Sequence, residues 1–387
     1  MKCTIADASD LVAGYAFKSK DFGDFEDKVI KITHITPPTV DMQNLSAVNM
    51  KEYDKSKLSK YIAKEGDYVL AMTGATIGKI GRIENGRALI NQRVLLFKPK
   101  DIVDKDFLYY ILTQKSFSKY VINHIDSESA QPNISAGTIG KYEFEVPNIE
   151  MQRKIGGILR NIDKKIEQNR RINDNLEEQA SALINDYFSS TAETVELGKI
   201  MSFENGFAFQ SKTYLSSGRY RIITIKNVQD GKIDAQGAAY IDEVPLRMKS
   251  GCFLSIGDVL LSLTGNVGRV GIVYEDNLLL NQRVAKFIPA DANILPWLYY
   301  YFRQTSTKIS LETIAKGTAQ QNLSPIETLK LCAPFEMESA KRLTEVLRPM
   351  FNHEIANSIE SLHLAELRDS LLPRLMTGEI DVSDIEL

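Results

Sequence analysis

The chain has 387 residues and a mass of 43.5 kDa, enough for about two or three domains, and 43% hydrophobic with 25% charged residues is ordinary for a soluble globular protein. A formal net charge of −3 excludes a uniformly basic nucleic-acid binder, and residues 336–387 carry most of the acidity, with 5 basic and 11 acidic side chains. Three separated cysteines without a CxxC pair argue against disulfides and zinc sites. With no signal-peptide pattern and no apolar run of about 20 residues, we expect a cytoplasmic protein.

From the N-terminus, the pattern indicates short strands and tight turns. The apolar run Tyr68–Met72 predicts a strand that stops at Thr73-Gly74. Two glycines three residues apart, Gly78 and Gly81, favour bends or a close approach of two backbones over a helix. A short helix is expected over residues 105–113.

Residues 149–188 then change to a helical pattern, with apolar residues and one asparagine placed seven positions apart. The same row returns near the C-terminus, again with an asparagine at its centre. The rows are Ile155, Ile162, Asn169, Leu176 and Leu183 in the first helix, and Leu343, Met350, Asn357, Leu364 and Leu371 in the second. A buried amide in an apolar row costs stability but fixes register, so we expect these two rows to form the seam of a helix pair. Pro349 is expected to interrupt the second helix.

The second half of the chain repeats the first half at an offset of about 190 residues. The matching segments are Gly14–Phe17 with Gly206–Phe209, Gly66-Asp67 with Gly257-Asp258, Thr73-Gly74 with Thr264-Gly265, Asn91–Val94 with Asn281–Val284, Leu108–Tyr110 with Leu298–Tyr300, and Gln131–Ser135 with Gln320–Ser324. These matches are collinear and their offset drifts only by single residues. We therefore infer a tandem duplication.

The predicted fold class is α+β, with two tandem-duplicated mixed α/β domains separated by two long antiparallel, coiled-coil helices in a pseudo-two-fold arrangement. The expected limits are residues 1–147 and 191–335 for the domains, 148–190 and 336–376 for the helices, and 377–387 for a C-terminal tail. Forty helical residues span roughly 60 Å.

The motifs of catalysis are missing. The segment Gly74–Lys79 resembles a phosphate-binding loop, but three residues separate its glycines where a Walker loop has four, and Ile80 stands where Ser or Thr is needed. The four histidines have neither a partner in the other copy nor the spacing of metal ligands. Neither an amino-methylating nor a nuclease motif occurs, and no Ser/His/Asp or Cys/His set is repeated. We predict a non-catalytic chain without a metal or cofactor of its own.

The duplicated polar residues suit binding to nucleic acid, because amides and guanidinium groups make paired contacts with base edges and cations contact phosphates. The candidate DNA-binding residues are Lys18, Thr73, Lys79, Asn91, Gln92, Arg93, Gln131, Asn133, Gln210, Thr264, Asn266, Arg269, Asn281, Gln282, Arg283, Gln320, Gln321 and Asn322. A structural role is the alternative, since such side chains often satisfy buried backbone groups. It is favoured for Asn91–Arg93 and its copy, which are unchanged in two domains that should bind different sequences.

Several segments together resemble the specificity subunit of type I restriction–modification systems, and the match covers nearly the whole chain. They are residues 65–74 and 91–94 with their second copies, residues 146–155 and 162–172, and the closing residues 367–380. The resemblance implies two target-recognition domains separated by a pair of long helices. It implies that each domain binds one half of a two-part site in double-stranded DNA, while the helices set the spacing and dock two methyltransferase (modification) subunits.

The resemblance further implies that the partner subunits hold the chemistry: S-adenosylmethionine for adenine-N6 methylation, and ATP with Mg in two restriction (motor-nuclease) subunits. We therefore expect a DNA sequence-recognition subunit that is not itself an enzyme. The alternative is an orphan or decoy interaction scaffold of the same fold that does not direct methylation. A free-standing methyltransferase or nuclease is disfavoured by the missing motifs.

Overall fold

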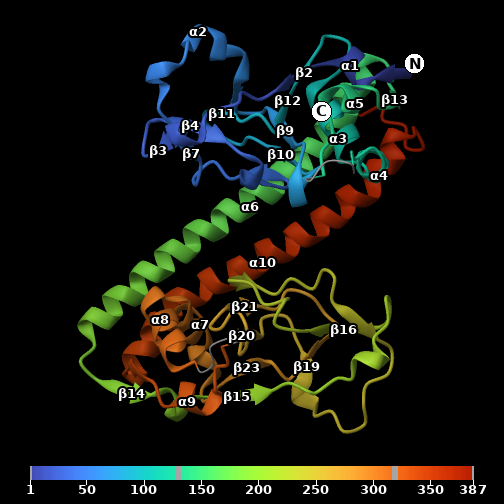
Figure 1. The fold of residues 1–387 in the computed structure, drawn as a ribbon. Coiled ribbons are helices and arrows are strands. Elements are labelled where there is room, and N and C mark those ends of the chain that lie inside the picture. The colour runs from blue at the N-terminus through green and yellow to red at the C-terminus, as the bar shows by residue number, and fades with distance from the viewer. Residues whose placement is uncertain (1, 127–131, 316–320, 386–387) are drawn as a thin grey trace. The chain divides into compact units, whose positions relative to one another are not determined.

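The computed structural model describes residues 2–126, 132–315 and 321–385. The chain divides into two compact units: unit 1 comprises residues 1–164 and 365–387, and unit 2 comprises residues 165–364. Two long helices, α6 (Ile149–Ser190) and α10 (Met337–Met376), each contribute residues to both units (Figure 1). The expected fold class, two tandem mixed α/β domains with long helices, is confirmed. The pseudo-two-fold relation of the copies stays a prediction.

Unit 1 consists of short strands and helices that precede α6. In chain order they are β1 (Lys2–Thr4), α1 (Ile5–Ala8), β2 (Ser9–Ala13), β3 (Phe22–Gly23), β4 (Asp27–Ile30), β5 (Ile35–Thr36), β6 (Thr39–Val40), β7 (Ser46–Val48), α2 (Lys55–Leu58), β8 (Ile62–Lys64), β9 (Tyr68–Ala71), β10 (Ile80–Arg82), β11 (Arg87–Ile90), β12 (Val94–Pro99), α3 (Lys105–Thr113), α4 (Lys115–Asn123), α5 (Ala136–Gly140) and β13 (Glu143–Glu145). The strands form one sheet in the order β2-β12-β9-β10-β6-β5, a second in the order β3-β7-β4-β11-β8, and the pair β1-β13. The pairs β10–β6 and β11–β4 are parallel, so both large sheets are mixed.

Unit 2 follows the same plan between the two long helices. Its elements are β14 (Thr194–Glu196), β15 (Met201–Asn205), β16 (Tyr220–Ile223), β17 (Gly231–Lys232), β18 (Ala239–Ile241), β19 (Phe253–Leu254), β20 (Val259–Ser262), β21 (Val270–Ile272), β22 (Leu278–Leu280), β23 (Val284–Pro289), α7 (Leu295–Arg303), α8 (Thr305–Ile314), α9 (Pro325–Leu329) and β24 (Cys332–Pro334). The sheet orders are β15-β23-β20-β21-β17 and β18-β16-β22-β19, with the pair β14-β24. Strand by strand, these orders repeat those of unit 1, which adds only the outer strands β3 and β5. The duplication of sequence is therefore a duplication of topology.

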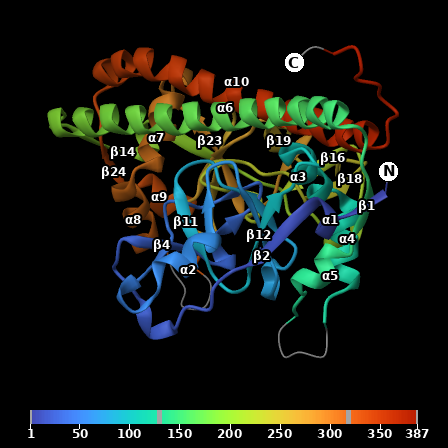
Figure 2. The same ribbon diagram turned by 90° about the horizontal axis from the view of Figure 1, so that it is seen from above.

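The central strand of each unit is buried on both faces. Because side chains alternate along a strand, Tyr68 and Leu70 of β9 enter a core shared with α3 and α6, whereas Val69 and Ala71 enter a second core to which both sheets contribute. Strand β20 divides its residues between two cores of unit 2 in the same way. Each unit is thus layered as helix, sheet and sheet, and Figure 2 shows α3 and α6 on one side of β12.

The repeated tyrosine pairs connect each domain to a long helix. Tyr109, Tyr110, Tyr299 and Tyr300 are all buried in the cores. In unit 1 the hydroxyl of Tyr110 donates a hydrogen bond of 2.5 Å to Asp163 of α6. In unit 2 the hydroxyl of Tyr300 donates one of 2.6 Å to Glu354 of α10. Each domain therefore contacts a carboxyl group of the helix that follows it in the chain, half-buried for Asp163 and buried for Glu354.

A buried guanidinium distinguishes the core of unit 1. Arg82 of β10 is only 4% exposed, and its Nη1 donates to the carboxylate of Asp106 in α3. Its Cζ lies 4.1 Å from the ring centroid of Tyr109, while Nε and Nη2 have no partner among the described residues. The strand register places Ile272 at the equivalent position of unit 2. Nothing in the sequence pattern of β10 predicted a charge in this core.

Helix α10 is continuous through Pro349, so the expected interruption of the second helix is wrong. Proline removes one backbone hydrogen bond and costs a helix roughly 3 kcal/mol. The neighbouring side chains of Leu347 and Phe351 are buried in the core of unit 2. This tertiary packing holds the helical backbone on both sides of the proline, because most helix stability in proteins comes from a packed apolar face.

The two asparagines that we predicted to lie in the helix seam, Asn169 and Asn357, are buried in unit 2. The Nδ2 atom of Asn169 donates to Glu360 Oε2 at 2.7 Å, and also lies 3.3 Å from the carbonyl oxygen of Asn357. Asn357 in turn donates to Asn173 at 2.8 Å. Asn173, which sequence reasoning missed, extends the contact by donating to the carbonyl of Glu354. Within unit 2, α6 and α10 therefore run antiparallel, and several polar side chains, not a single pair of asparagines, join them.

The apolar residues of the predicted seam have mixed surroundings. Ile155 is buried in the core of unit 1, and Leu371 packs against that core. Leu183, Leu343 and Met350 pack against the core of unit 2. The remaining members, which are Ile162, Leu176 and Leu364, are half-buried. Much of this row therefore stabilises contacts between a long helix and its adjacent domain.

Replacing Gly14 with alanine is expected to destabilise unit 1 by about 1–3 kcal/mol or more. A Cβ atom at Gly14 would lie 2.1 Å from the carbonyl oxygen of Asn91, so the backbone would have to move. Gly206 meets Asn281 at the same 2.1 Å, which explains why this glycine is repeated. Thermal unfolding checks the loss. Gly137→Ala in the same unit is the matched control for a glycine substitution, since the nearest atom to its Cβ position, Ser135 Oγ, lies at 3.7 Å; an equal loss there would show that close packing is not the cause.

Candidate nucleic-acid interface

Three loops of unit 1 meet where β9, β11 and β12 end or begin. The backbone N–H of Met72 donates to the carbonyl of Arg93 at 2.9 Å, and the N–H of Ile134 donates to the carbonyl of Met72 at 2.9 Å. The N–H of Gly74 donates to the carbonyl of Pro132 at 3.1 Å. We name these loops, residues 73–74, 91–93 and 132–133, loop cluster 1. Backbone hydrogen bonds thus join three segments that are far apart in the sequence.

Side chains reinforce loop cluster 1. The hydroxyl of Thr73, which is 5% exposed, donates to the carbonyl of Pro132 at 2.8 Å. The Nη1 atom of Arg93 donates to Asn133 Oδ1 at 3.3 Å. Gln92 and Arg93 are exposed, so most donors of the guanidinium face solvent. Gly74 and Gly78 have φ angles of +72° and +80°, a conformation that favours glycine and confirms the predicted bend.

Unit 2 builds the same arrangement from its own residues. The loops 264–265, 281–283 and 321–322 form loop cluster 2, with backbone hydrogen bonds from Leu263 to Arg283 and from Gly265 to Gln321. Thr264 is 4% exposed, and its hydroxyl donates to Asn322 Oδ1 at 2.9 Å. Arg283 Nη1 lies 3.4 Å from the same oxygen, which repeats the Arg93–Asn133 contact.

The remaining candidate residues fall into three groups. Lys18, Lys79, Gln210, Asn266, Gln282, Arg283, Gln321 and Asn322 are exposed. Asn91 is half-buried with its Oδ1 accepting from the N–H of Gln92, whereas Asn281 is 8% exposed. Gln131 and Gln320 lie outside the described residues. The structure therefore brings the Thr, Asn-Gln-Arg and Asn candidates of each unit together.

Arg269 has a partner that sequence reasoning missed. Its Nη1 donates to Gln229 Oε1 at 2.8 Å, and the side chain is half-buried. The residue at the equivalent offset in the first copy is Thr36, so comparison of the repeats could not have found Gln229. Among the described residues, Arg269 thus has a side-chain hydrogen bond that its exposed counterpart Lys79 lacks.

Four exposed cations, two in the loop clusters and two outside them, have no carboxylate partner among the described residues. Within the described part of the chain, no carboxylate forms an ion pair with Arg93, Arg283, Lys18 or Lys79. Elsewhere in the same units, arginines such as Arg221 and Arg303 are paired with acids. An exposed, unpaired guanidinium beside amide groups can bind a phosphate or a guanine edge.

In the described ranges, no group of three or more His, Cys, Asp or Glu side chains could hold a metal ion. Over those residues, no helix is long and apolar enough to cross a membrane. The three cysteines are free thiols. The amide and guanidinium groups of the clusters can form hydrogen bonds with a ligand.

Comparisons with known proteins identify what this arrangement resembles. The sequence profile of the type I restriction modification DNA specificity domain matches residues 2–178 and 189–361. The chain is 24% identical over 346 residues to the type I restriction enzyme MjaIX specificity subunit of Methanocaldococcus jannaschii, covering 82% of this chain and 78% of the relative. It is 23% identical over 412 residues to the HindI specificity subunit of Haemophilus influenzae, covering 83% and 88%. The crystal structure of the S subunit from M. genitalium has the same fold, with a TM-score of 0.59 at 15% identity over 97% of this chain and 95% of that one.

Proposed function

Because this chain belongs to the family of type I restriction–modification DNA specificity domains and is a specificity subunit of that class, we propose that each of its two domains binds one half of a two-part DNA site through its loop cluster. The observation that carries this proposal is the duplicated pairing of an exposed arginine with an asparagine, Arg93 with Asn133 and Arg283 with Asn322. The same polar geometry occurs once in each unit, as a two-part site requires.

The hydroxyls of the buried threonines Thr73 and Thr264 form hydrogen bonds within the clusters. We therefore do not propose them as DNA contacts. Gln92, Arg93, Gln282 and Arg283 are proposed to contact the DNA, with Lys18 and Lys79 contacting phosphates. Their residue types supply amide and guanidinium donors for base edges and cations for the backbone. Sequence differences in the surrounding loops would then decide which bases each domain prefers.

We propose that the long helices set the distance between the half-sites and dock two modification subunits. Helix α6 has 42 residues and is therefore about 63 Å long, which corresponds to roughly 18 base pairs. In the assembled complex, S-adenosylmethionine bound to the modification subunits would supply the methyl group for adenine N6. Two restriction subunits with ATP and Mg would join for cleavage. All of this would take place in the cytoplasm, where prokaryotic DNA lies.

Methylome sequencing tests the proposal. A methylation-free host would express this chain with the methyltransferase encoded beside it, and we expect a two-part adenine-methylated motif that disappears when this chain is omitted. Exchange of residues 1–190 for those of a relative with a known target should replace one half of the motif and leave the other. A soluble complex without methylation would instead support a decoy scaffold, and an unchanged motif after the exchange would contradict the assignment of half-sites to domains.

Replacing Arg93 or Arg283 with alanine is expected to weaken DNA binding about tenfold or more at moderate salt, because a guanidinium that contacts DNA is lost. If the contact is to a phosphate, the slope of log K against log salt should fall by about 0.9. Fluorescence anisotropy with the assembled methyltransferase measures both. Arg87→Ala is the matched control, since Arg87 is exposed at the opposite end of β11. Equal affinities for Arg93→Ala and Arg87→Ala would assign Arg93 to the scaffold.

A further inference from the structure

Unit 2 contains a cavity of about 390 Å³ that shares no residue with loop cluster 2. Side chains from α6, α7 and α10 line it, together with residues in and after β17 and β21. The lining is acidic: it includes Asp174, Glu177, Asp230, Asp234, Glu275 and Glu354, against the two bases Arg170 and Lys232. This volume is in the range of cavities that hold small molecules.

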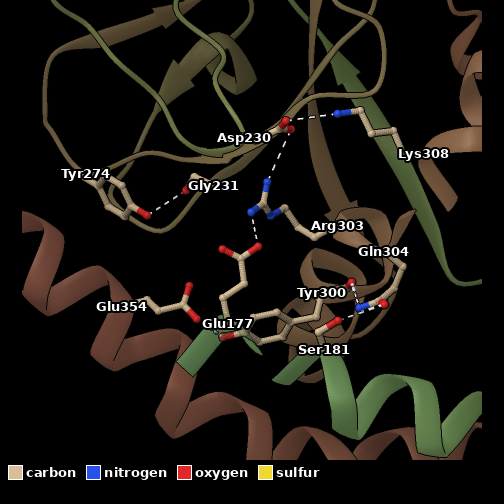
Figure 3. A network of polar contacts seen from close by, with 10 residues as sticks. All are labelled: Glu177, Ser181, Asp230, Gly231, Tyr274, Tyr300, Arg303, Gln304, Lys308 and Glu354. Carbon is tan, nitrogen blue, oxygen red and sulfur yellow. Dashed lines mark hydrogen bonds and ion pairs between the residues drawn. The ribbon is translucent and has the colours of Figure 1, made fainter. Parts of the chain in front are cut away.

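Four of the six acids around the cavity form ion pairs, whereas Glu354 pairs with no cation among the described residues. Arg303 donates to Glu177 and lies 3.5 Å from Asp230, which also pairs with Lys308 at 3.2 Å (Figure 3). Glu354, only 4% exposed, accepts one hydrogen bond at Oε1 from Tyr300. Over the described residues its carboxyl group forms no ion pair and its Oε2 accepts no hydrogen bond. A buried carboxylate with one neutral donor is poorly compensated.

A second polar group, the hydroxyl of Tyr299, lies beside the same space. Tyr299 lines the cavity and is 1% exposed, and within the described part of the chain its hydroxyl forms no hydrogen bond. Its hydroxyl oxygen lies 3.8 Å from the Cβ position of Gly231, another lining residue. By contrast, the neighbouring Tyr274 hydroxyl donates to the carbonyl of Gly231 at 2.9 Å. The hydroxyl of Tyr299 beside the cavity is therefore available to form a hydrogen bond with an occupant.

Unit 1 shows what completes the equivalent site. There the carboxylate of Asp163, bonded to Tyr110, also accepts from the guanidinium of Arg368 at 2.8 Å. Asp163 and Arg368 line a cavity of about 290 Å³ together with both tyrosines of that repeat. Unit 2 has the tyrosine–carboxyl pair, but its nearby guanidinium, that of Arg303, pairs with Glu177 and Asp230 and not with Glu354.

We propose that the cavity of unit 2 binds a small organic cation whose guanidinium or primary ammonium group occupies the place that Arg368 takes in unit 1. The cation donates hydrogen bonds to the carboxylate of Glu354 and to the hydroxyl oxygen of Tyr299. A metal ion fits less well, because the described residues offer no cluster of three ligands. The proposal does not depend on the DNA-binding role of the loop clusters.

Isothermal titration calorimetry of the full chain with agmatine, in low salt at pH 8, tests this site. We expect saturable one-to-one binding, and at least tenfold weaker binding to the variants Glu354→Gln and Tyr299→Phe. Glu345→Gln is the control, because Glu345 is an exposed acid on the same helix. Butylurea, a neutral probe of similar shape to an alkylguanidinium, should bind at least tenfold more weakly than agmatine.

Equal binding of agmatine and butylurea, equal affinities of Glu354→Gln and Glu345→Gln, or no binding at millimolar agmatine would overturn the proposal. Circular dichroism confirms that each variant is folded before titration. The complex with the modification subunit distinguishes the source of the cation. Agmatine binding to both forms supports a free small cation, whereas binding to the isolated chain alone supports a cationic side chain of the partner.

Discussion

Replacing Asp106 with alanine should reduce the free energy of unfolding of unit 1 by about 3–5 kcal/mol. The substitution removes the only carboxylate that pairs with Arg82 within the described residues, and leaves a guanidinium that is 4% exposed without a counter-ion. Two of its nitrogens already lack partners, so the rings of Tyr68 and Tyr109 are the remaining compensation. Chemical denaturation followed by far-UV circular dichroism measures the loss.

The second copy of the repeat supplies the control for this prediction. Unit 2 has Ile272 where unit 1 has Arg82, and Pro296 at the offset that corresponds to Asp106. The double variant Arg82→Ile with Asp106→Ala should therefore recover most of the lost stability, because replacing a buried ion pair by apolar groups is often neutral or stabilising. A double variant as unstable as Asp106→Ala alone would show that the helix position, rather than the unpaired charge, causes the loss.

Raising the pH from about 5 to about 8 should destabilise unit 2 through Glu354 by up to about 3 kcal/mol. Burial, together with the nearby charge of Glu177, raises the pKa of Glu354 to about 7, while Tyr300 and Arg303 act in the opposite direction. In the unfolded chain this carboxyl group titrates near its ordinary pKa of about 4.5. Between these values the native state holds a proton that the unfolded state has released, so stability falls as the pH rises and the loss is complete above the folded pKa.

Glu354→Gln should remove this dependence, because the amide can still accept the hydrogen bond from Tyr300 but does not ionise. We expect the variant to match the wild type at pH 5 and to exceed its stability at pH 8. Urea unfolding followed by tryptophan fluorescence suits the measurement, since the single tryptophan, Trp297, lies in the core of unit 2. Glu345→Gln serves as the exposed control. Identical pH profiles for Glu354→Gln and the wild type would contradict the assignment.

The sequence predicted the repeating architecture because its signals are local. Apolar runs of four or five residues, a glycine pair and a seven-residue row each depend on neighbours in the chain, and β9, α3 and the two long helices lie where these patterns placed them. The repeat in the sequence also predicted that the two copies share one fold, and the sheets of the two units have equivalent strand orders. Pro349 was misjudged because its helix is held by Leu347 and Phe351 against a distant core, an effect that local pattern does not contain.

The candidate site was predictable only in its repeated part. The convergence of Thr73, Arg93 and Asn133 follows from their shared repetition, although their hydrogen bonds required the fold. Residues present in one copy alone, such as Gln229 beside Arg269, gave no signal. Arg82 and Glu354 were also missed, because a charged residue in a strand or on a long helix is usually solvated and only tertiary packing buries it.

The buried Arg82–Asp106 pair also limits how the gene can recombine with itself. Two repeats of matching topology can recombine with each other. A crossover between codons 82 and 106 would give one product that combines Arg82 with Pro296 of the second copy, and another that combines Ile272 with Asp106. The first product encloses an unmatched charge and would be cleared by selection on folding. Viable chimaeras should therefore inherit these 25 codons as a single block, whatever DNA target they acquire.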